Sequence, residues 1–499
     1  MKHHVKFFVP WAAIFSMLVG ALSIAHRLAA QESAANPISK VERKNRAPIS
    51  QEVLRVKLPK PVEAKLKNGL TVLIAEDHRF PTVSVQLQIS GAGALFEPAN
   101  LPGLASVTAQ MLREGTKSQS SKQIAEAADK LGAIVGAAAE FGSTVTIFSA
   151  SGLSDNFAGW FSLATEVLLD PSFPADELEK LKQRLRAQLR QQRANANFLL
   201  EERFHRAVFG NHPAATVSAT LESIDTLTPE LLAKWHHERY APQNAILGIA
   251  GDVRAAELIP KLEKWLIGWN RSELKETFPN RPVPALGRKV YLVDRPDSVQ
   301  TTIALGNLAI DRRSPDYIPM VVMNHILGGG ATARLFLNLR EEKGYTYGVY
   351  SNFIAVRYPG PWRAGGNMRT EVTAGALTEF FHEIRRIRDE KVSAIELADT
   401  QRAITARFAL SLEQPTGALG FAIVRKAYGF PPDYWETYPA KVRAVTVEDV
   451  QRVARRYLNP DAMQLVAVGD GRKIQSDLEK YGPVAVYDSN GKPASIAKP

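Results

Sequence analysis

Apolar and polar positions follow two periods along the chain, one typical of strands and one typical of amphipathic helices. In residues 103–116, GLASVTAQMLREGT, the apolar positions recur at helical spacing and predict a helix with one buried face. These positions are Leu104, Val107, Met111 and Leu112. The exposed positions are small or polar, with no histidine, cysteine or carboxylate before Glu114. The predicted helix therefore presents no obvious catalytic group.

Two longer segments share one order of predicted elements. They are residues 227–253, LTPELLAKWHHERYAPQNAILGIAGDV, and residues 445–471, VTVEDVQRVARRYLNPDAMQLVAVGDG. Each begins with a threonine at a helix N-cap and a glutamate in the first helical turn. Each then continues through a tyrosine and a proline-containing turn into an apolar strand that ends in Gly-Asp. We infer that the chain contains an internal duplication.

The segments upstream of these copies also correspond. Residues 70–97 and 288–312 both predict a strand, a short turn and an alternating strand, and a helix follows each of them. In the second half this helix is predicted over residues 315–327. We therefore predict an α+β fold of two homologous halves, each a mostly antiparallel sheet with helices stacked on one face, joined by a linker as a clamshell.

The boundaries of these parts follow from composition. Residues 62–268 form the predicted N-terminal domain and residues 290–475 the C-terminal domain. The linker, residues 269–289, contains three prolines and mixed charges. Residues 31–61 are polar without a period and predict a tether, and residues 476–499 predict a disordered tail.

The N-terminal residues 1–30 predict export. A basic start, MKHHVK, precedes an uncharged run from Phe7 to Ala25, and a small residue at Ala30 suits cleavage of a signal peptide. The run is also long enough to span a bilayer, so an uncleaved inner-membrane anchor remains the alternative. Either segment places the rest of the chain outside the cytoplasm, and we expect a periplasmic protein or a membrane-tethered one facing the periplasm.

Composition narrows the possible chemistry. The 499 residues are 45% hydrophobic and 23% charged, which suits two or more globular domains. The net charge of +11 is scattered along the chain, with no nucleic-acid-binding motif, so we expect no nucleic-acid partner. Because the chain has no cysteine, disulfides, thiolate zinc sites and cysteine nucleophiles are excluded.

The histidines form no metal-binding pattern. Neither His-Glu-x-x-His nor His-x-x-Glu-His occurs in the sequence. His236 and His237 are neighbours on a predicted helix, so they point to different faces and do not pair on one metal. The others are isolated, flank a helix end or belong to the N-terminal segment. These are His3, His4, His26, His78, His205, His212, His325 and His382.

From about residue 62 to residue 475, the order of motifs resembles the pitrilysin/insulinase family of zinc peptidases, which includes the mitochondrial processing peptidase. The resemblance is carried by the GLA…M…GT helix, by the strands that end in Gly-Asp, and by residues 327–351, LGGGATARLFLNLREEKGYTYGVYS. In that family the first-half helix carries His-x-x-Glu-His. Its histidines bind zinc and its glutamate is the general base, and a further glutamate downstream completes the ligands.

This chain departs from the family at every one of those positions. The residues that correspond to His, Glu and His are Ser106, Ala109 and Gln110. The downstream glutamate corresponds to about Ala187, and no carboxylate lies between residues 180 and 200. Hydroxyl and amide groups are poor zinc ligands, and alanine transfers no proton. We therefore expect no catalytic zinc and no other cofactor in this chain.

The second half retains a pair that the resemblance marks as functional. Arg340 and Tyr347 match the arginine and tyrosine that the C-terminal half of the family directs toward the zinc site. The resemblance implies that they bind the peptide backbone and stabilise the oxyanion. The predicted arrangement places Arg340 at the end of a helix and Tyr347 at the start of a strand, after a turn at Gly344.

These features favour a zinc-free subunit of an exported heterodimeric metallopeptidase. Its expected partner is a homologous subunit that carries the intact motif and Zn²⁺, and its expected substrate is a peptide or unfolded polypeptide. The chain alone is expected to be inactive, with Arg340 and Tyr347 acting at the partner's zinc. One alternative is a peptide-binding or assembly scaffold in which both residues serve packing. A further alternative is an active metallopeptidase with substitute ligands.

Overall fold

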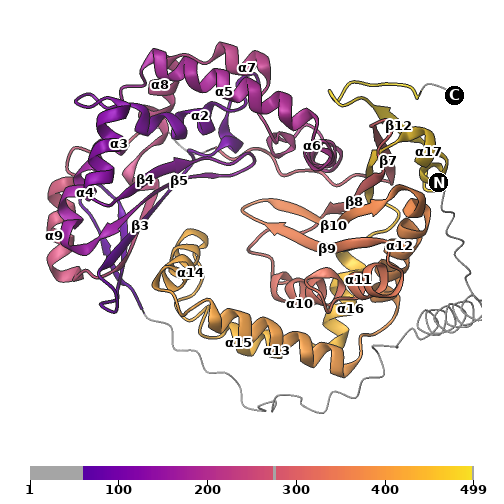
Figure 1. Ribbon diagram of the computed structural model, residues 1–499. Coiled ribbons are helices and arrows are strands. Elements are labelled where there is room, and N and C mark those ends of the chain that lie inside the picture. The colour runs from indigo at the N-terminus through magenta and orange to yellow at the C-terminus, as the bar shows by residue number, and fades with distance from the viewer. Residues whose placement is uncertain (1–59, 274–276, 497–499) are drawn as a thin grey trace, which may run out of the picture. The chain divides into compact units, whose positions relative to one another are not determined.

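Two six-stranded sheets organise the molecule, and they share the order of five strands but differ in the edge strand, β1 or β12 (Figure 1). The computed structural model describes residues 60–273 and 277–496. The N-terminal sheet has the order β1-β2-β6-β3-β5-β4 and the C-terminal sheet the order β12-β7-β11-β8-β10-β9. Pairing is antiparallel except that β2 runs parallel to β6, and β7 runs parallel to β11 and β12. The predicted α+β fold of two homologous halves is confirmed.

The strands and helices of the first half begin and end as follows. The strands are β1 Val62–Lys65, β2 Thr71–Glu76, β3 Thr82–Ser90, β4 Ile134–Ala138, β5 Val145–Leu153 and β6 Ala245–Gly251. The helices are α2 Leu104–Met111, α3 Ser121–Lys130, α4 Phe157–Leu169, α5 Ala175–Arg193, α6 Ala196–Phe209, α7 Leu221–Thr226, α8 Pro229–Arg239 and α9 Ala255–Trp265.

The second half follows the same order, except that its edge strand comes at the end of the half instead of the start. Its strands are β7 Lys289–Asp294, β8 Gln300–Leu308, β9 Thr346–Ala355, β10 Pro359–Arg369, β11 Gln464–Gly469 and β12 Val484–Tyr487. Its helices are α10 Tyr317–Gly328, α11 Arg334–Phe336, a π-helical turn Leu337–Glu342, α12 Thr373–Asp389, α13 Ala394–Leu410, α14 Pro415–Tyr428, α15 Tyr438–Arg443, α16 Val447–Tyr457 and α17 Gly471–Glu479.

Side-chain alternation explains how one face of each sheet is buried. In β3 every second residue is buried, from Val83 to Ile89, and these residues pack in the core with α2, α4 and α8. β11 differs because all six of its residues are buried. A strand that is apolar at successive positions must be covered on both faces. The second cover comes from the opposite half of the chain.

The two halves exchange a helix. In β11, Leu465 and Ala467 face the core of their own half, whereas Val466 and Val468 pack with Leu200, Phe204 and Val208 of α6. α6 belongs to the first half in sequence but covers the second sheet.

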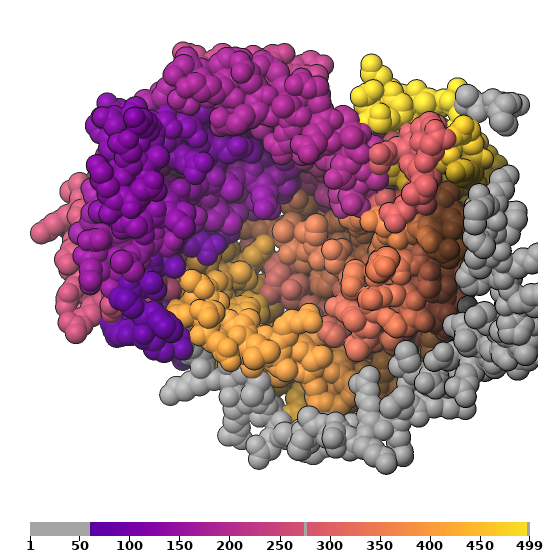
Figure 2. All heavy atoms as spheres, viewed as in Figure 1, coloured from indigo at the N-terminus to yellow at the C-terminus, as the bar shows by residue number. Residues whose placement is uncertain are grey.

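The converse exchange places α14 on the first sheet. Leu73 and Ala75 of β2 pack with Leu419 and Ile423 of α14, while the alternate residues Val72 and Ile74 face the core of the first half. Gly248 of β6 permits this close approach, since a Cβ atom there would lie 2.8 Å from Ile423 Cδ1. Figure 2 shows α14 against the indigo N-terminal half.

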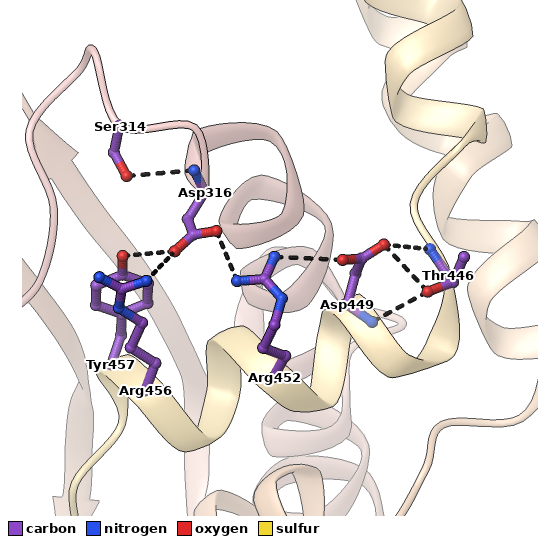
Figure 3. Close-up of polar contacts among 7 residues, drawn as sticks. All are labelled: Ser314, Asp316, Thr446, Asp449, Arg452, Arg456 and Tyr457. Atoms are coloured by element: carbon purple, nitrogen blue, oxygen red, sulfur yellow. Dashed lines mark hydrogen bonds and ion pairs between the residues drawn. The ribbon is translucent and has the colours of Figure 1, made fainter.

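A buried carboxylate joins α10 to α16 (Figure 3). Asp316 precedes α10 and accepts hydrogen bonds from Tyr457 Oη at 2.7 Å and from the guanidinium groups of Arg452 and Arg456 at 2.7 and 3.2 Å. Burial acts to raise the pKa of Asp316, but these bonds and positive charges outweigh it, and the pKa lies below its ordinary value.

The predicted disordered tail, residues 476–499, is wrong as far as residue 496. α17 continues to Glu479, and β12 pairs in parallel with β7. The guanidinium of Arg203 in α6 lies 3.4 Å from the ring centroid of Tyr487 and donates to the Gly491 carbonyl at 3.1 Å. Contacts with distant elements order this segment, and its own short polar sequence does not reveal them.

The predicted leader 1–30, and the tether as far as residue 59, lie outside the described residues. Among the residues that the structure does describe, no helix is both long and apolar enough to cross a membrane. In the described part of the predicted linker, residues 269–289, neither helix nor strand occurs before Lys289, the first residue of β7; Trp269 is buried and Phe278 packs edge-on against Phe96.

Replacement of Asp316 by asparagine should lower the free energy of unfolding by about 1.5–3 kcal/mol, because hydrogen bonds to a charged acceptor are lost. The native pKa is lowered, so the contribution is complete above the ordinary value of 3.8 and disappears as the pH falls through the native pKa. Urea unfolding of both proteins should show the difference near pH 7 and its decrease in acid. The exposed Asp433→Asn is the control; equal effects would contradict the assignment.

Leu419→Ala and Ile423→Ala should each reduce the free energy of unfolding by about 2–5 kcal/mol, since each leaves a cavity between α14 and the first sheet. Leu410→Ala provides a matched control near the end of α13, where the side chain is 65% exposed. Denaturant titrations of the purified chain measure all three. Losses at 419 and 423 no larger than that at 410 would show that α14 does not depend on this contact.

Candidate functional site

The residues at the N-terminus of helix α2 hold the start of the helix in position. Gly103 at the N-cap has φ +101°, a conformation that favours glycine. The Glu97 carboxylate accepts hydrogen bonds from the backbone N–H groups of Gly103 at 2.9 Å and Ala105 at 2.6 Å. These bonds satisfy two of the free donors at the helix start. The carboxylate therefore fixes where α2 begins.

The predicted buried face of α2 is confirmed and is broader than its periodicity indicates. Leu104, Val107, Met111 and Leu112 are buried, and Thr108 and Ala109 are buried as well. The Thr108 hydroxyl donates to the Leu104 carbonyl at 2.7 Å. Ala109, at the position of the family's general base, is 1% exposed and offers only a methyl group. The helix is a packed structural element with little surface.

Ser106 and Gln110 satisfy one another on the accessible part of α2. The Gln110 Nε2 amide donates to the Ser106 hydroxyl at 3.2 Å and to the Ser106 carbonyl at 3.3 Å. Both groups are neutral, and they lie one helical turn apart. Ala187 is exposed on α5 and does not line the pocket next to Ser106. The position predicted for the downstream ligand therefore adds no donor.

A pocket of about 560 Å³ lies beside Ser106 and Gln110, and we call it the α2 pocket. It is lined by Ser106, Gln110, Ala137, Ala138, Ala139, Glu140, Phe141, Phe198, Glu201 and Val217. Catalytic zinc requires three protein ligands drawn mainly from histidine, cysteine and carboxylate side chains. Within the described residues no group of three such side chains is placed to hold a metal ion. The residues present do not fit zinc.

A second pocket, of about 680 Å³, contains both retained residues of the C-terminal half. We call it the arginine pocket. Its walls come from α6, β8, the π-helical turn, β9 and β10. The lining residues are Asn197, Leu200, Gln300, Thr302, Arg340, Gly344, Tyr345, Thr346, Tyr347, Gly348, Tyr350, Arg363, Gly365, Gly366, Asn367 and Arg369. The structure thus brings Arg340 and Tyr347 to one pocket, and their functional roles stay predictions.

The π-helical turn determines the position of Arg340. The Lys343 N–H donates to the Asn338 carbonyl, five residues earlier, at 3.0 Å. The buried Asn338 side chain donates to Glu379 and Glu383 of α12, both at 2.9 Å. The turn is therefore fastened to a neighbouring helix, although the sequence predicts one regular helix here.

Tyr347 projects into solvent. Its side chain is 92% exposed, which excludes a packing role within this chain. Arg340 lies over the Phe336 ring, 4.7 Å from the ring centroid, and its Nε is 3.5 Å from a Glu341 oxygen. Both polar groups are thus available to a ligand: a phenol that donates or accepts, and a guanidinium with several donors.

Sequence reasoning missed Arg363 and Arg369 of the arginine pocket. They occur in β10 at an even spacing, together with Gly365 and Asn367, so all four face the same side of the sheet. This period of two is the signal that identifies them. This spacing points to a pocket only when one residue on the same face of the strand is already known to line it.

Two models of one protein family match this chain. The model described as insulinase, peptidase family M16, matches residues 71–220, and the model described as the peptidase M16 inactive domain matches residues 226–404. The chain belongs to peptidase family M16, the insulinase family. The resemblance inferred from the sequence is confirmed, and the first M16 match includes the α2 helix that lacks the zinc ligands.

M16 relatives have been given contrasting names. An uncharacterized zinc protease of Rickettsia bellii is 27% identical over 341 residues, 68% of this chain and 81% of that protein. A Helicobacter pylori protein named a non-peptidase homolog is 21% identical over 406 residues, 81% of this chain and 92% of that protein. A solved structure described as the peptidase M16 inactive domain from Pseudomonas fluorescens is 28% identical, with a TM-score of 0.76 over 82% of this chain and 98% of that one.

The cap of α2 carries a pH dependence. Burial raises the pKa of Glu97 to about 7, and the two backbone N–H donors only partly oppose this. A raised pKa means that the native state favours the protonated form. The stabilising contribution is therefore complete below the ordinary value of 4.5 and is lost as the pH rises through about 7.

Replacement of Glu97 by glutamine, a neutral side chain of the same shape, should remove this pH dependence. The unfolding free energy of the wild type minus that of the variant should fall between pH 4.5 and pH 8, by at most about 3 kcal/mol. Urea unfolding over this range measures the difference, and the exposed Glu126→Gln provides the control. A difference that is constant with pH would contradict the assignment.

Proposed function

We propose that this chain is the zinc-free subunit of an exported M16 peptidase pair, which binds polypeptide substrates for a zinc-bearing homologue. The observation that carries the proposal is the division of chemistry between the two pockets. Beside the α2 pocket, no group of three described side chains is placed to hold a metal ion, and Ala109 stands at the position of the family's general base, whereas the arginine pocket keeps Arg340 and the exposed Tyr347. Such a chain binds a polypeptide but does not activate water.

The side chains of the arginine pocket suit a peptide carbonyl or carboxylate. The guanidinium of Arg340 offers donors in a fixed planar arrangement, and the Tyr347 hydroxyl supplies a further donor on a stiff ring. In an assembly that brings a substrate carbonyl to this pocket, these donors would stabilise the negative charge that develops on the carbonyl oxygen. Zinc in the partner supplies the activated water.

The sequence supports the proposed partner and the proposed location. The expected partner is an M16 chain with an intact His-x-x-Glu-His motif, because only such a chain supplies the missing ligands and base. The N-terminal segment, residues 1–30, supports export and either a periplasmic subunit or one tethered to the inner membrane. The Rickettsia bellii relative is named an uncharacterized zinc protease, and this name supports a zinc-bearing homologue as the partner.

A second candidate function is a polypeptide-binding scaffold that takes no part in hydrolysis. The Helicobacter pylori relative favours it, since that protein is named a non-peptidase homolog and matches 81% of this chain. In this case Arg340 and Tyr347 bind the polypeptide and affect affinity only.

Metal analysis and co-expression test the proposal. The purified chain should hold no stoichiometric zinc after dialysis, and one tightly bound zinc per chain would refute both candidate functions. Co-expressed with an M16 chain of the same organism that has the intact motif, it should co-purify and give peptidase activity.

In that complex, Arg340→Ala and Tyr347→Phe should each lower kcat by about 100- to 1,000-fold, the range for loss of one donor to a developing oxyanion. Arg313→Ala, an exposed arginine outside both pockets, is the matched control. Unchanged turnover with weaker peptide binding in both variants would favour the scaffold.

A further inference from the structure

The two pockets carry opposite charge. Among the described residues, the arginine pocket is lined by three guanidinium groups, those of Arg340, Arg363 and Arg369, and by no carboxylate. The α2 pocket is lined by the carboxylates of Glu140 and Glu201 and by no cationic side chain from the part of the chain that the structure describes. Since a ligand is attracted to charge opposite to its own, the two pockets select different parts of one ligand.

Two arginines of the arginine pocket form only weak ion pairs, and their glutamate partners lie outside the pocket. Arg369 lies 3.1 Å from Glu371, and Arg340 lies 3.5 Å from Glu341. Neither glutamate lines the pocket, and both side chains are more than half exposed. Exposed ion pairs of this kind contribute little free energy. Both guanidinium groups can therefore exchange these partners for a ligand carboxylate.

The α2 pocket contains one carboxylate that is free for a ligand. Glu201 pairs with Arg363 and lies 3.7 Å from His205 Nε2. Glu140 is exposed and forms no ion pair with any residue that the structure describes. The negative charge that a basic ligand meets here is chiefly that of Glu140.

Helix α6 is the wall between the pockets. Asn197 and Leu200 line the arginine pocket, and Phe198 and Glu201 line the α2 pocket. Because Glu201 pairs with Arg363 across this wall, the pockets adjoin one another. Each has the volume of an ordinary ligand site, within about 300–1,000 Å³. A single extended polypeptide that crosses α6 can therefore reach both pockets.

We propose that the polypeptide ligand of this chain is bipolar, with an acidic part in the arginine pocket and a basic part in the α2 pocket. The inference rests on the proposed polypeptide-binding function and adds the charge order of the ligand. Aromatic side chains in both pockets, among them Tyr345, Phe141 and Phe198, accept apolar residues of any type. Charge, rather than one particular side chain, then sets the register.

Three fluorescent peptides of identical composition test the charge order. One has lysines in its N-terminal half and glutamates in its C-terminal half, the second has the reverse order, and the third alternates them. Fluorescence anisotropy with the purified full chain at low salt should show one block peptide bound about tenfold more tightly than the alternating peptide. The preference should shrink as salt screens the charges.

Exchange of the charges in the protein should exchange the preference. Glu140 and Arg369 are both exposed, so the double variant Glu140→Lys/Arg369→Glu should fold normally and favour the other block peptide. The control double variant Glu126→Lys/Arg313→Glu makes the same charge changes outside both pockets and should keep the wild-type preference.

The outcomes separate the two levels of the proposal. Equal binding of all three peptides leaves polypeptide binding in place and refutes the charge order. Binding of none of them refutes the polypeptide-binding function itself. A preference that persists in the Glu140→Lys/Arg369→Glu variant shows that other residues determine it and overturns the assignment to these pockets.

Discussion

The exchange of helices between the two halves is the contact on which the rest of the structure depends. Each sheet packs its own helices on one face and a helix from the other half on the opposite face: α6 on the second sheet and α14 on the first. Without α14, Leu73 and Ala75 would lose their cover, and without α6 the same would hold for Val466 and Val468. Exposure of such a continuous apolar surface is costly in water, so the halves must fold together.

Local periodicity predicts the elements, but it does not identify what they pack against. The alternation in β3 and the helical spacing around Met111 both give the correct element, because each pattern marks a buried face. The pattern of α14 is equally ordinary, and nothing in it shows that Leu419 meets the other half's sheet. The π-helical turn is hidden for a related reason. Its register depends on bonds from Asn338 to α12, which lie about forty residues away in sequence.

The candidate site shows the same division between what sequence reveals and what it does not. The loss of zinc ligands at Ser106 and Gln110 is visible from the motif frame alone, as is the retention of Arg340. What occupies the vacated position is visible only in the structure: a neutral amide–hydroxyl pair, where related enzymes hold a dication. Arg363 and Arg369 are not predictable from the sequence of β10, because the elements that form a pocket with this face of the strand lie elsewhere in the sequence.

At the junction between α5 and α6, Ala194 and Asn195, the chain passes from the body of the first sheet to that of the second. The two pockets therefore differ in how many packed bodies form their walls. The arginine pocket is built from one packed body, the second sheet together with α6, so it keeps its shape as long as that body stays intact. The α2 pocket takes Ser106 from one body and Phe198 from the other. A ligand confined to the arginine pocket does not strengthen the contact between the halves. A ligand that also fills the α2 pocket contacts both halves and stabilises their association.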